Sequence, residues 1–253
     1  MKPSYTIKDS PGKGKGVFAS KAIDPGATII KDPVAIKINK DPPSIDETDV
    51  DKAFGLLSKA DQDRFMALHE GSRPYPSRTF RIYKANAFGS KGVGRLYLDV
   101  SLINHSCVAN AEVMEQDNGV DVLAVKPIAK GEEVFITYNL TFTKMIKKHR
   151  QICTRVYYGF ECDCSACRLP PRKQALSDSR RQILNVMTSN LDDMQPVDFR
   201  FIDFLGTLSP KQAEDPRMLR GMQQFPLQKP LSAQQKAAYS FLVARFLEAE
   251  GLS

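Results

Sequence analysis

The sequence contains no run of about 18 apolar residues, the length that a membrane-spanning helix needs. Residues 1–16 also lack the apolar centre of a secretory signal peptide. We therefore expect an intracellular protein without a membrane partner. The chain has 253 residues, and the 42% that are hydrophobic are enough for a buried core, so disorder is not the expected state.

Cysteine is scarce, and its count of five is odd, so the cysteines cannot all pair in disulfides. Three form the pattern Cys162-x-Cys164-x-x-Cys167, which in a reducing compartment favours metal binding. Three thiols are one ligand short of a closed tetrahedral zinc site. Cys107, 55 residues before Cys162, is the best fourth donor by type; the alternative is a loop of reduced cysteines without metal. Cys153, on a predicted helix face, is expected to be a small buried hydrophobe.

Strong charge of one sign is also missing. The 36 Lys and Arg against 29 Asp and Glu give a net charge of +7 and a pI near 9.1, but the basic residues are scattered. This pattern indicates a mildly basic, solvated surface rather than a nucleic-acid-binding stripe. A zinc-dependent nucleic-acid-binding protein is an alternative that lacks both paired finger spacing and a basic helix, so nucleic acid is not expected as a direct ligand.

Nucleotide-binding loops are absent too. The glycine-rich segment 12–18 has neither the spacing of a phosphate-binding loop nor that of a dinucleotide-binding turn, which disfavours binding of a nucleoside triphosphate. By itself the segment is a flexible turn, although its glycines would let a ligand approach the backbone closely.

Apolar periodicity divides the chain into regions. Residues 5–38 predict short β-strands broken by glycine, and residues 41–78 predict an inserted segment with two short helices. More strands than helices are expected from 80 to 138, and residues 142–158 predict a helix with Val156 on its apolar side. The apolar runs that indicate strands between 80 and 138 are 95–103, 111–115, 120–125 and 133–138.

The chain after residue 170 predicts a C-terminal helical appendage. Apolar residues step by three and four between 183 and 194. Residues 232–235 form a capping-box pattern, and Gly251 is well placed to end the helix that follows it.

Five motif segments follow one another in the sequence. They are GKGKGVFASKAIDPGATI at 12–29, NAF at 86–88, SLINHSC at 101–107, KPIAKGEEVFITY at 126–138 and YGFECDCSAC at 158–167. In this order and spacing they resemble SET-domain proteins over roughly residues 5–168. The branch that they resemble is the split-SET branch that contains the SET-and-MYND enzymes, because the cysteine of NHSC and a CxCxxC tail occur together there.

The resemblance implies an α+β fold that is mainly β, with small curled β-sheets and a knot-like crossing. In that fold the NHSC segment and the tyrosine-bearing strand lie side by side under the cofactor. We expect a SET domain at 1–140 with its helical insert at 41–78, a helix plus zinc-binding post-SET segment at 141–169, and a C-terminal helical region at 170–253.

The resemblance also implies a cofactor site. Asn104 and His105 would hold the adenosine and amino-acid parts of S-adenosylmethionine, and Phe160 would stack on the adenine. The implied zinc ligands are Cys107, Cys162, Cys164 and Cys167. The metal would then position an aromatic wall of the cofactor pocket. Further cofactor contacts are implied for Lys13, Gly14, Lys15, Asn86, Ser101 and Tyr138.

Tyr138 resembles the catalytic tyrosine of the family, and Tyr158 is a candidate wall of the substrate channel. A free lysine has a pKa near ~10.4, so its amine must lose a proton before it can attack the methyl group. Desolvation in an aromatic channel and the nearby sulfonium charge both favour that loss. Outside this motif, Tyr138 would be read as a core tyrosine and His105 as a structural histidine.

The sequence departs from the family pattern in three places. Ala109 replaces the usual proline of NHSCxPN, and we expect a looser local backbone there, while Asn110 is retained. The interval 41–78 has no cysteine, so the MYND zinc module is absent from it. The region 170–253 is shorter than the helical domain of the related enzymes.

The function that these residues predict is S-adenosylmethionine-dependent methylation of a lysine on a histone or non-histone protein. The alternative is a catalytically silent SET module that acts as a binding scaffold. We expect a monomer in the nucleus, the cytoplasm or both. The sequence does not identify the target protein or the number of methyl groups added.

Overall fold

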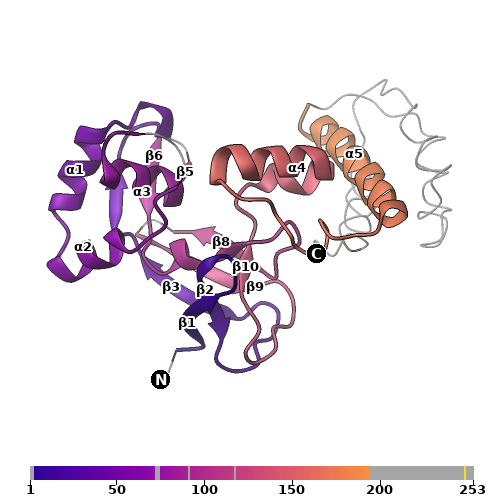
Figure 1. Cartoon of the computed structure of the whole chain (residues 1–253), viewed down its shortest axis with the longest axis horizontal. Coiled ribbons are helices and arrows are strands. Elements are labelled where there is room, and N and C mark those ends of the chain that lie inside the picture. Colours follow the sequence, from indigo (N-terminus) through magenta and orange to yellow (C-terminus); the bar gives the residue numbers. More distant parts are fainter. Residues whose placement is uncertain (1–2, 72–74, 91, 117, 194–247, 249–253) are drawn as a thin grey trace. The chain divides into compact units, whose positions relative to one another are not determined.

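In the computed structural model, the described residues are 3–71, 75–90, 92–116, 118–193 and 248. They form two compact units (Figure 1). The first unit comprises the described residues up to Ile136 together with Thr154–Phe160, and the second comprises Thr137–Cys153 and the described residues from Glu161 onward.

The first unit contains four small β-sheets. Their strands are β1 (Tyr5–Ser10), β2 (Gly14–Ala19), β3 (Thr28–Pro33), β4 (Ile36–Ile38), β5 (Phe88–Ser90), β6 (Val93–Leu96), β7 (Asn104–His105), β8 (Ala111–Glu115), β9 (Gly119–Ala124) and β10 (Phe135–Ile136). β1 and β2 form an antiparallel hairpin, and the orders β3-β9-β8 and β4-β6-β5 are also antiparallel. β7 and β10 pair in parallel. This topology confirms the predicted α+β class with small sheets; the knot-like crossing stays a prediction.

Three helices of the first unit begin in the same way. They are α1 (Glu47–Gly55), α2 (Lys59–Met66) and α3 (Arg78–Asn86). Before each helix, the side chain of Asp46, Ser58 or Ser77 accepts a hydrogen bond from the backbone amide of the third helical residue, which is the usual N-cap. The two helices expected within 41–78 are confirmed as α1 and α2. α3 lies almost entirely beyond that segment, in the region where more strands than helices were expected. It was not predicted, because nine residues are too few for periodicity alone to reveal a helix.

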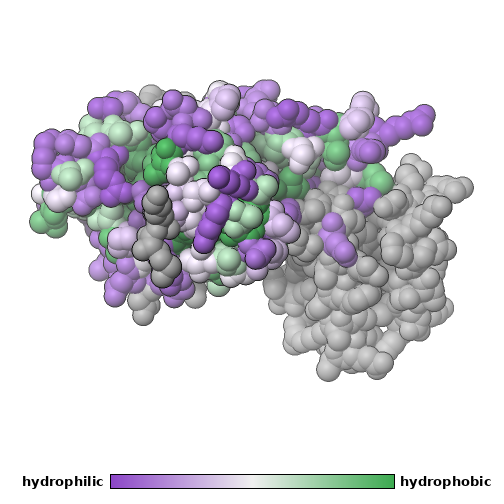
Figure 2. Space-filling model, turned by 90° about the horizontal axis from the view of Figure 1, so that it is seen from below, coloured by the Kyte–Doolittle hydropathy of each residue, from purple (hydrophilic) through white to green (hydrophobic). Residues whose placement is uncertain are grey.

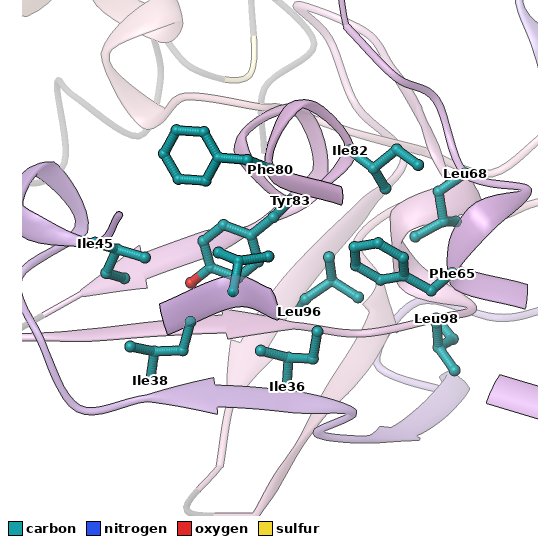
Figure 3. Close-up of a cluster of buried hydrophobic side chains, with 11 residues drawn as sticks. Ile36, Ile38, Ile45, Phe65, Leu68, Phe80, Ile82, Tyr83, Leu96 and Leu98 are labelled. Carbon is teal, nitrogen blue, oxygen red and sulfur yellow. The ribbon is translucent and has the colours of Figure 1, made fainter. Parts of the chain in front are cut away.

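The helices and the β4-β6-β5 sheet share one hydrophobic core (Figure 3). Ile36 and Ile38 of β4 and Leu96 of β6 face Phe65 of α2 and Tyr83 of α3. Strands as short as these are marginal by themselves, so burial against the helices stabilises the sheet. The remaining members of the cluster are Ile45, Val50, Leu68, Phe80, Ile82 and Leu98.

A buried carboxylate interrupts the apolar run 95–103, which indicated a strand and is one only up to Leu96 of β6. Oδ2 of Asp32 accepts hydrogen bonds from the backbone amides of Asp99, at 2.7 Å, and Val100, at 2.9 Å. These bonds turn the chain after β6 into the 3-10 turn Val100–Leu102. Burial raises the pKa of Asp32, although both hydrogen bonds act in the opposite direction.

Replacing Asp32 by alanine is expected to lower the free energy of unfolding by about 2 kcal/mol, because two backbone amides lose their acceptor. Asp32→Asn keeps an acceptor oxygen and should cost less. The raised pKa means that the folded state binds the proton more tightly than the unfolded chain. The protonation-dependent part of this carboxyl's contribution to stability is therefore full below its unfolded pKa and is lost as pH rises through its folded pKa, whereas the acceptor oxygen that alanine removes is present in both protonation states. Urea denaturation of the three proteins tests this, and equal loss in both variants would contradict the role of the acceptor.

The second unit begins with a 3-10 turn at Leu140–Lys144, which is followed by α4 (Lys147–Cys153) and, later, α5 (Pro171–Asp193). Arg181 of α5 is fully buried, and its Nη1 donates to the carbonyl oxygens of Phe142, at 3.0 Å, and Thr143, at 3.1 Å. α5 therefore holds the 3-10 turn. The patterns predicted at 194, at 232–235 and at Gly251 lie outside the described residues.

The single helix predicted over 142–158 is confirmed only in part. α-helical geometry is confined to α4, and Thr154–Tyr158 forms a π-helical turn. A π turn is wider than an α turn, so the side chains after Cys153 no longer follow the 3.6-residue period. Val156 is consequently 53% exposed rather than on an apolar face, and Cys153 is half-buried rather than buried.

The surface of the described residues is mixed. On the face shown in Figure 2, hydrophobic and hydrophilic side chains alternate in small patches. Among the described residues, no helix is both long enough and apolar enough to cross a membrane.

Candidate functional site

The centre of the candidate site is the parallel pair of β7 and β10. Phe135 lies opposite Asn104, and Ile136 lies opposite His105. Ser106 continues the pairing, since its amide donates to the carbonyl oxygen of Ile136 at 3.0 Å. The predicted side-by-side arrangement of the NHSC segment and the tyrosine-bearing strand is thus confirmed up to Ile136. Tyr138 is half-buried and follows that residue by two positions in the sequence.

Asn110 holds the strand that leads to this pair. Its side chain is 8% exposed; Nδ2 donates to the carbonyl oxygen of Glu133 at 2.9 Å, and Oδ1 accepts from the amide of Phe135 at 2.7 Å. In the sequence, Asn110 stood out only as a retained motif residue, and no role could be assigned to it. At the neighbouring Ala109, where a looser backbone was expected, the carbonyl oxygen accepts from Nζ of Lys126 at 2.9 Å.

Glu133 is a second residue whose role the sequence analysis missed. Its carboxylate accepts from Oγ of Ser10 at 3.0 Å and from Nδ2 of Asn104 at 2.7 Å. Nδ2 of Asn104 also donates to the carbonyl oxygen of Lys15 at 2.9 Å. The side chain of Asn104 therefore ties β7 to the β1-β2 hairpin. The signal available in the sequence was the position of Glu133 in the GEE segment.

The glycine-rich hairpin packs tightly at one position and is open at another. A Cβ atom at Gly16 would lie 2.5 Å from Oε1 of Glu133 and 3.0 Å from Nδ2 of Asn104, so a larger residue would force the Glu133 carboxylate out of its present position. Gly14 has a φ of 77° with open space around it. Nζ of Lys13 lies 4.8 Å from the centre of the Phe135 ring.

The other predicted cofactor contacts make bonds within the protein. Nζ of Lys15 pairs with the carboxylate of Asp9 at 2.7 Å on the surface. Nδ2 of Asn86 donates to the carbonyl oxygens of Ile82, at 2.7 Å, and His69, at 2.6 Å. The hydroxyl of Ser101 donates to the carbonyl oxygen of Tyr97. Any cofactor contact by Asn86 or Ser101 would therefore use a backbone group or a side-chain acceptor, whereas the exposed ammonium of Lys15 has further N–H donors.

Three rings of the first unit lie in a row, and we call them the aromatic wall: His105, Phe160 and Tyr158. The ring centres of His105 and Phe160 are 6.0 Å apart, and those of Phe160 and Tyr158 are 6.4 Å apart. His105 is buried, and its Nε2 lies 3.4 Å from Sγ of Cys107. His105 thus contacts both the Phe160 ring and Cys107, a predicted metal ligand. His69 and His149 are exposed, as expected from the sequence.

The cysteines supply a donor set for a metal ion. The sulfur atoms of Cys162, Cys164 and Cys167 lie within 4.8 Å of one another, and together with Cys107 they make a group of four thiols that could hold a metal. Cys107, Cys162 and Cys167 are buried. Four thiolates are the ligand set of a closed structural zinc site, so the residues present fit this metal.

Comparison with known proteins gives a consistent result. Residues 14–139 match the SET domain family. Histone-lysine N-methyltransferase set5 of Schizosaccharomyces pombe is 29% identical over 186 residues, which cover 71% of this chain and 56% of that protein. N-lysine methyltransferase SMYD2 of Gallus gallus is 32% identical over 108 residues, which cover 36% of this chain and 24% of that protein. The chain thus spans about half the length of the first relative and about a quarter of the second.

Proposed function

Because the chain belongs to the SET-domain family, we propose that it is an S-adenosylmethionine-dependent protein-lysine N-methyltransferase. The observation that carries this proposal is the pairing of Asn104 and His105 with the strand that leads to Tyr138, with the Phe160 ring 6.0 Å from the ring of His105. The family motifs assign Asn104, His105, Tyr138 and Phe160 to the same methyl-transfer reaction. Strand pairing and the ring contact connect the segments on or next to which these residues lie.

The cofactor would bind at the hairpin, β7 and Phe160. Phe160 would stack on the adenine, and its contact with His105 limits the freedom of the ring. Nδ2 of Asn104 already has two acceptors, so Asn104 would use its Oδ1 and backbone. Oδ1 is an acceptor, which suits the ammonium group of the methionine part. Gly14, with its open backbone, would let the cofactor approach the hairpin.

Bound S-adenosylmethionine supplies the methyl group, and the protein aligns the lysine. Transfer requires a neutral amine in line with the sulfur–methyl bond and close to it. We assign Tyr138 to orient that amine and to stabilise charge as it shifts from sulfur to nitrogen. Tyr158, whose ring is 6.4 Å from that of Phe160, would form part of the channel wall, where desolvation favours the neutral amine.

Zinc bound by Cys107, Cys162, Cys164 and Cys167 would stabilise the segment that carries the aromatic wall. Phe160 precedes Cys162 by two residues, so ligation of that cysteine would restrict where the ring can lie. The metal would thus favour cofactor binding by holding the Phe160 ring in position, without contacting the cofactor. The substrate would be a lysine of a histone or another protein. The enzyme would act as a monomer in the nucleus or the cytoplasm.

Calorimetric titration of the zinc-loaded protein with S-adenosylmethionine tests the cofactor site. We expect Phe160→Ala to weaken binding about 5- to 100-fold, since stacking of a base on an aromatic ring contributes about 1–3 kcal/mol. Asn104→Ala should also weaken it. Tyr157→Ala is the matched control, because this aromatic side chain on the same turn is 59% exposed.

The outcomes are distinct. Weaker binding in Phe160→Ala and Asn104→Ala but not in Tyr157→Ala supports the site. Equal weakening in Phe160→Ala and Tyr157→Ala would mean that the segment that carries both residues, and not the Phe160 ring, is what matters. No heat and no thermal shift with wild-type protein at high cofactor concentration would reject the enzyme and leave the silent scaffold.

A further inference from the structure

Two adjacent residues of α4, Arg150 and Gln151, contact the segment Cys162–Cys167, which we call the cysteine loop. All of these residues belong to the second unit. The side-chain amide of Gln151 is used at both ends: Nε2 donates to the carbonyl oxygen of Cys162 at 2.6 Å, and Oε1 accepts from the amide of Cys162 at 3.0 Å. This pair of bonds copies the exchange between two strands and fixes the peptide groups on both sides of the Cys162 side chain.

Arg150 reaches the other end of the same loop. Its side chain is fully buried, Nη1 donates to the carbonyl oxygen of Met145 at 2.6 Å, and Nη2 donates to Sγ of Cys167 at 3.7 Å. Burying a guanidinium costs several kcal/mol unless an opposite charge lies nearby. A thiolate at Cys167 would place such an opposite charge within hydrogen-bonding distance of Nη2.

Helix α4 itself is held in place. It has only seven residues, too few for a stable isolated helix. Its first backbone amide, that of Lys147, donates to Oδ1 of Asp178 on α5 at 2.8 Å. Asp178 is in turn bonded by Nε2 of Gln174 at 2.9 Å. The two contacts of α4 with the cysteine loop therefore come from a supported element, as precise positioning of ligands requires.

We propose that Arg150 and Gln151 are positioning residues of the metal site, with Arg150 offsetting the charge of the thiolates and Gln151 fixing Cys162. This proposal rests on the zinc site of the proposed function. Zn²⁺ with four thiolates has a net charge of −2, and N–H donors to sulfur reduce the cost of burying that charge. Contacts of this kind commonly change metal affinity by about 10- to 100-fold.

The test is the zinc affinity of the purified full chain, measured by competition with a chromophoric chelator. We expect Arg150→Met and Gln151→Glu each to bind zinc about 10- to 100-fold more weakly than wild type. In Gln151→Glu the donor to the Cys162 carbonyl is lost and a negative charge is added near the thiolates. Arg150→Lys keeps the charge and should lie between Arg150→Met and wild type.

Arg181→Met is the matched control, because Arg181 is equally buried in the same unit but its Nη1 and Nε donate to carbonyl and hydroxyl oxygens. It should lower the melting temperature while leaving zinc affinity close to wild type. Cobalt(II) loaded in place of zinc reports sulfur ligation by its charge-transfer absorption in the same variants, independently of enzyme activity.

The results separate the two proposals. Wild-type protein that binds neither zinc nor cobalt would reject the metal site itself. Zinc binding that is strong in wild type and unchanged in Arg150→Met and Gln151→Glu would overturn the roles of these residues alone. Equal weakening in Arg181→Met would assign the effect to loss of any buried arginine. If Arg150→Met does not fold, Gln151→Glu and Arg150→Lys decide the outcome.

Discussion

Replacing Tyr138 by phenylalanine is expected to lower the rate of methyl transfer by about 100- to 1,000-fold while leaving affinity for S-adenosylmethionine nearly unchanged. The substitution removes one hydroxyl and keeps the ring. That hydroxyl would act mainly when charge moves from sulfur to nitrogen, so its loss affects the transition state more than the bound cofactor.

The measurement is transfer of a tritiated methyl group to proteins of a cell extract, combined with calorimetric titration of the cofactor. Tyr158→Phe is the control, because a channel wall needs the ring more than the hydroxyl and should keep most of the activity. A Tyr138→Phe protein as fast as wild type would remove Tyr138 from the mechanism. Equal slowing of both variants would mean that the two hydroxyls act together.

Loss of one zinc ligand is the second large effect that we expect. Cys164→Ala should abolish stoichiometric zinc binding and lower the melting temperature on the order of 10 °C, because structural zinc contributes several kcal/mol or more to folding. Affinity for S-adenosylmethionine should fall as well, since the segment that carries Phe160 would lose its support.

Cys153→Ala provides the comparison. Cys153 and Cys164 are both half-buried, but only Cys164 belongs to the group of thiols that could hold a metal. The control should keep its zinc and melt within a few degrees of wild type. Metal content by elemental analysis and thermal denaturation give the answer, and unchanged zinc content in Cys164→Ala would contradict the proposed ligand set.

Part of the candidate site could be predicted from the sequence because its signals are local or belong to a motif. Three cysteines within six residues cannot lie far apart, and their sulfur atoms are within 4.8 Å of one another. The resemblance to SET-domain proteins also implied that the NHSC segment lies beside the strand before Tyr138, which the pairing of β7 with β10 confirms up to Ile136. The ligand set, the cofactor contacts and the catalytic role remain predictions.

Other features could not be predicted because they depend on exact geometry. The run 142–158 contains good helix formers, but the change to a π turn after Cys153 depends on packing that periodicity does not record. The run 95–103 is apolar, but the two hydrogen bonds to Asp32 turn the chain within it, and Asp32 lies 67 residues before Asp99 in sequence.

The sequence by itself determined the SET-domain family and the three clustered thiols, because both are defined by particular residue types within short motifs. The resemblance to that family in turn implied the small-sheet architecture. Only the tertiary structure decided that Asn110 and Glu133 hold the site strands, and that Arg150 and Gln151 contact the cysteine loop. These contacts join residues 11 to 29 positions apart. A hydrogen bond across such a distance forms only when folding brings donor and acceptor together, and no local pattern of residues specifies that geometry.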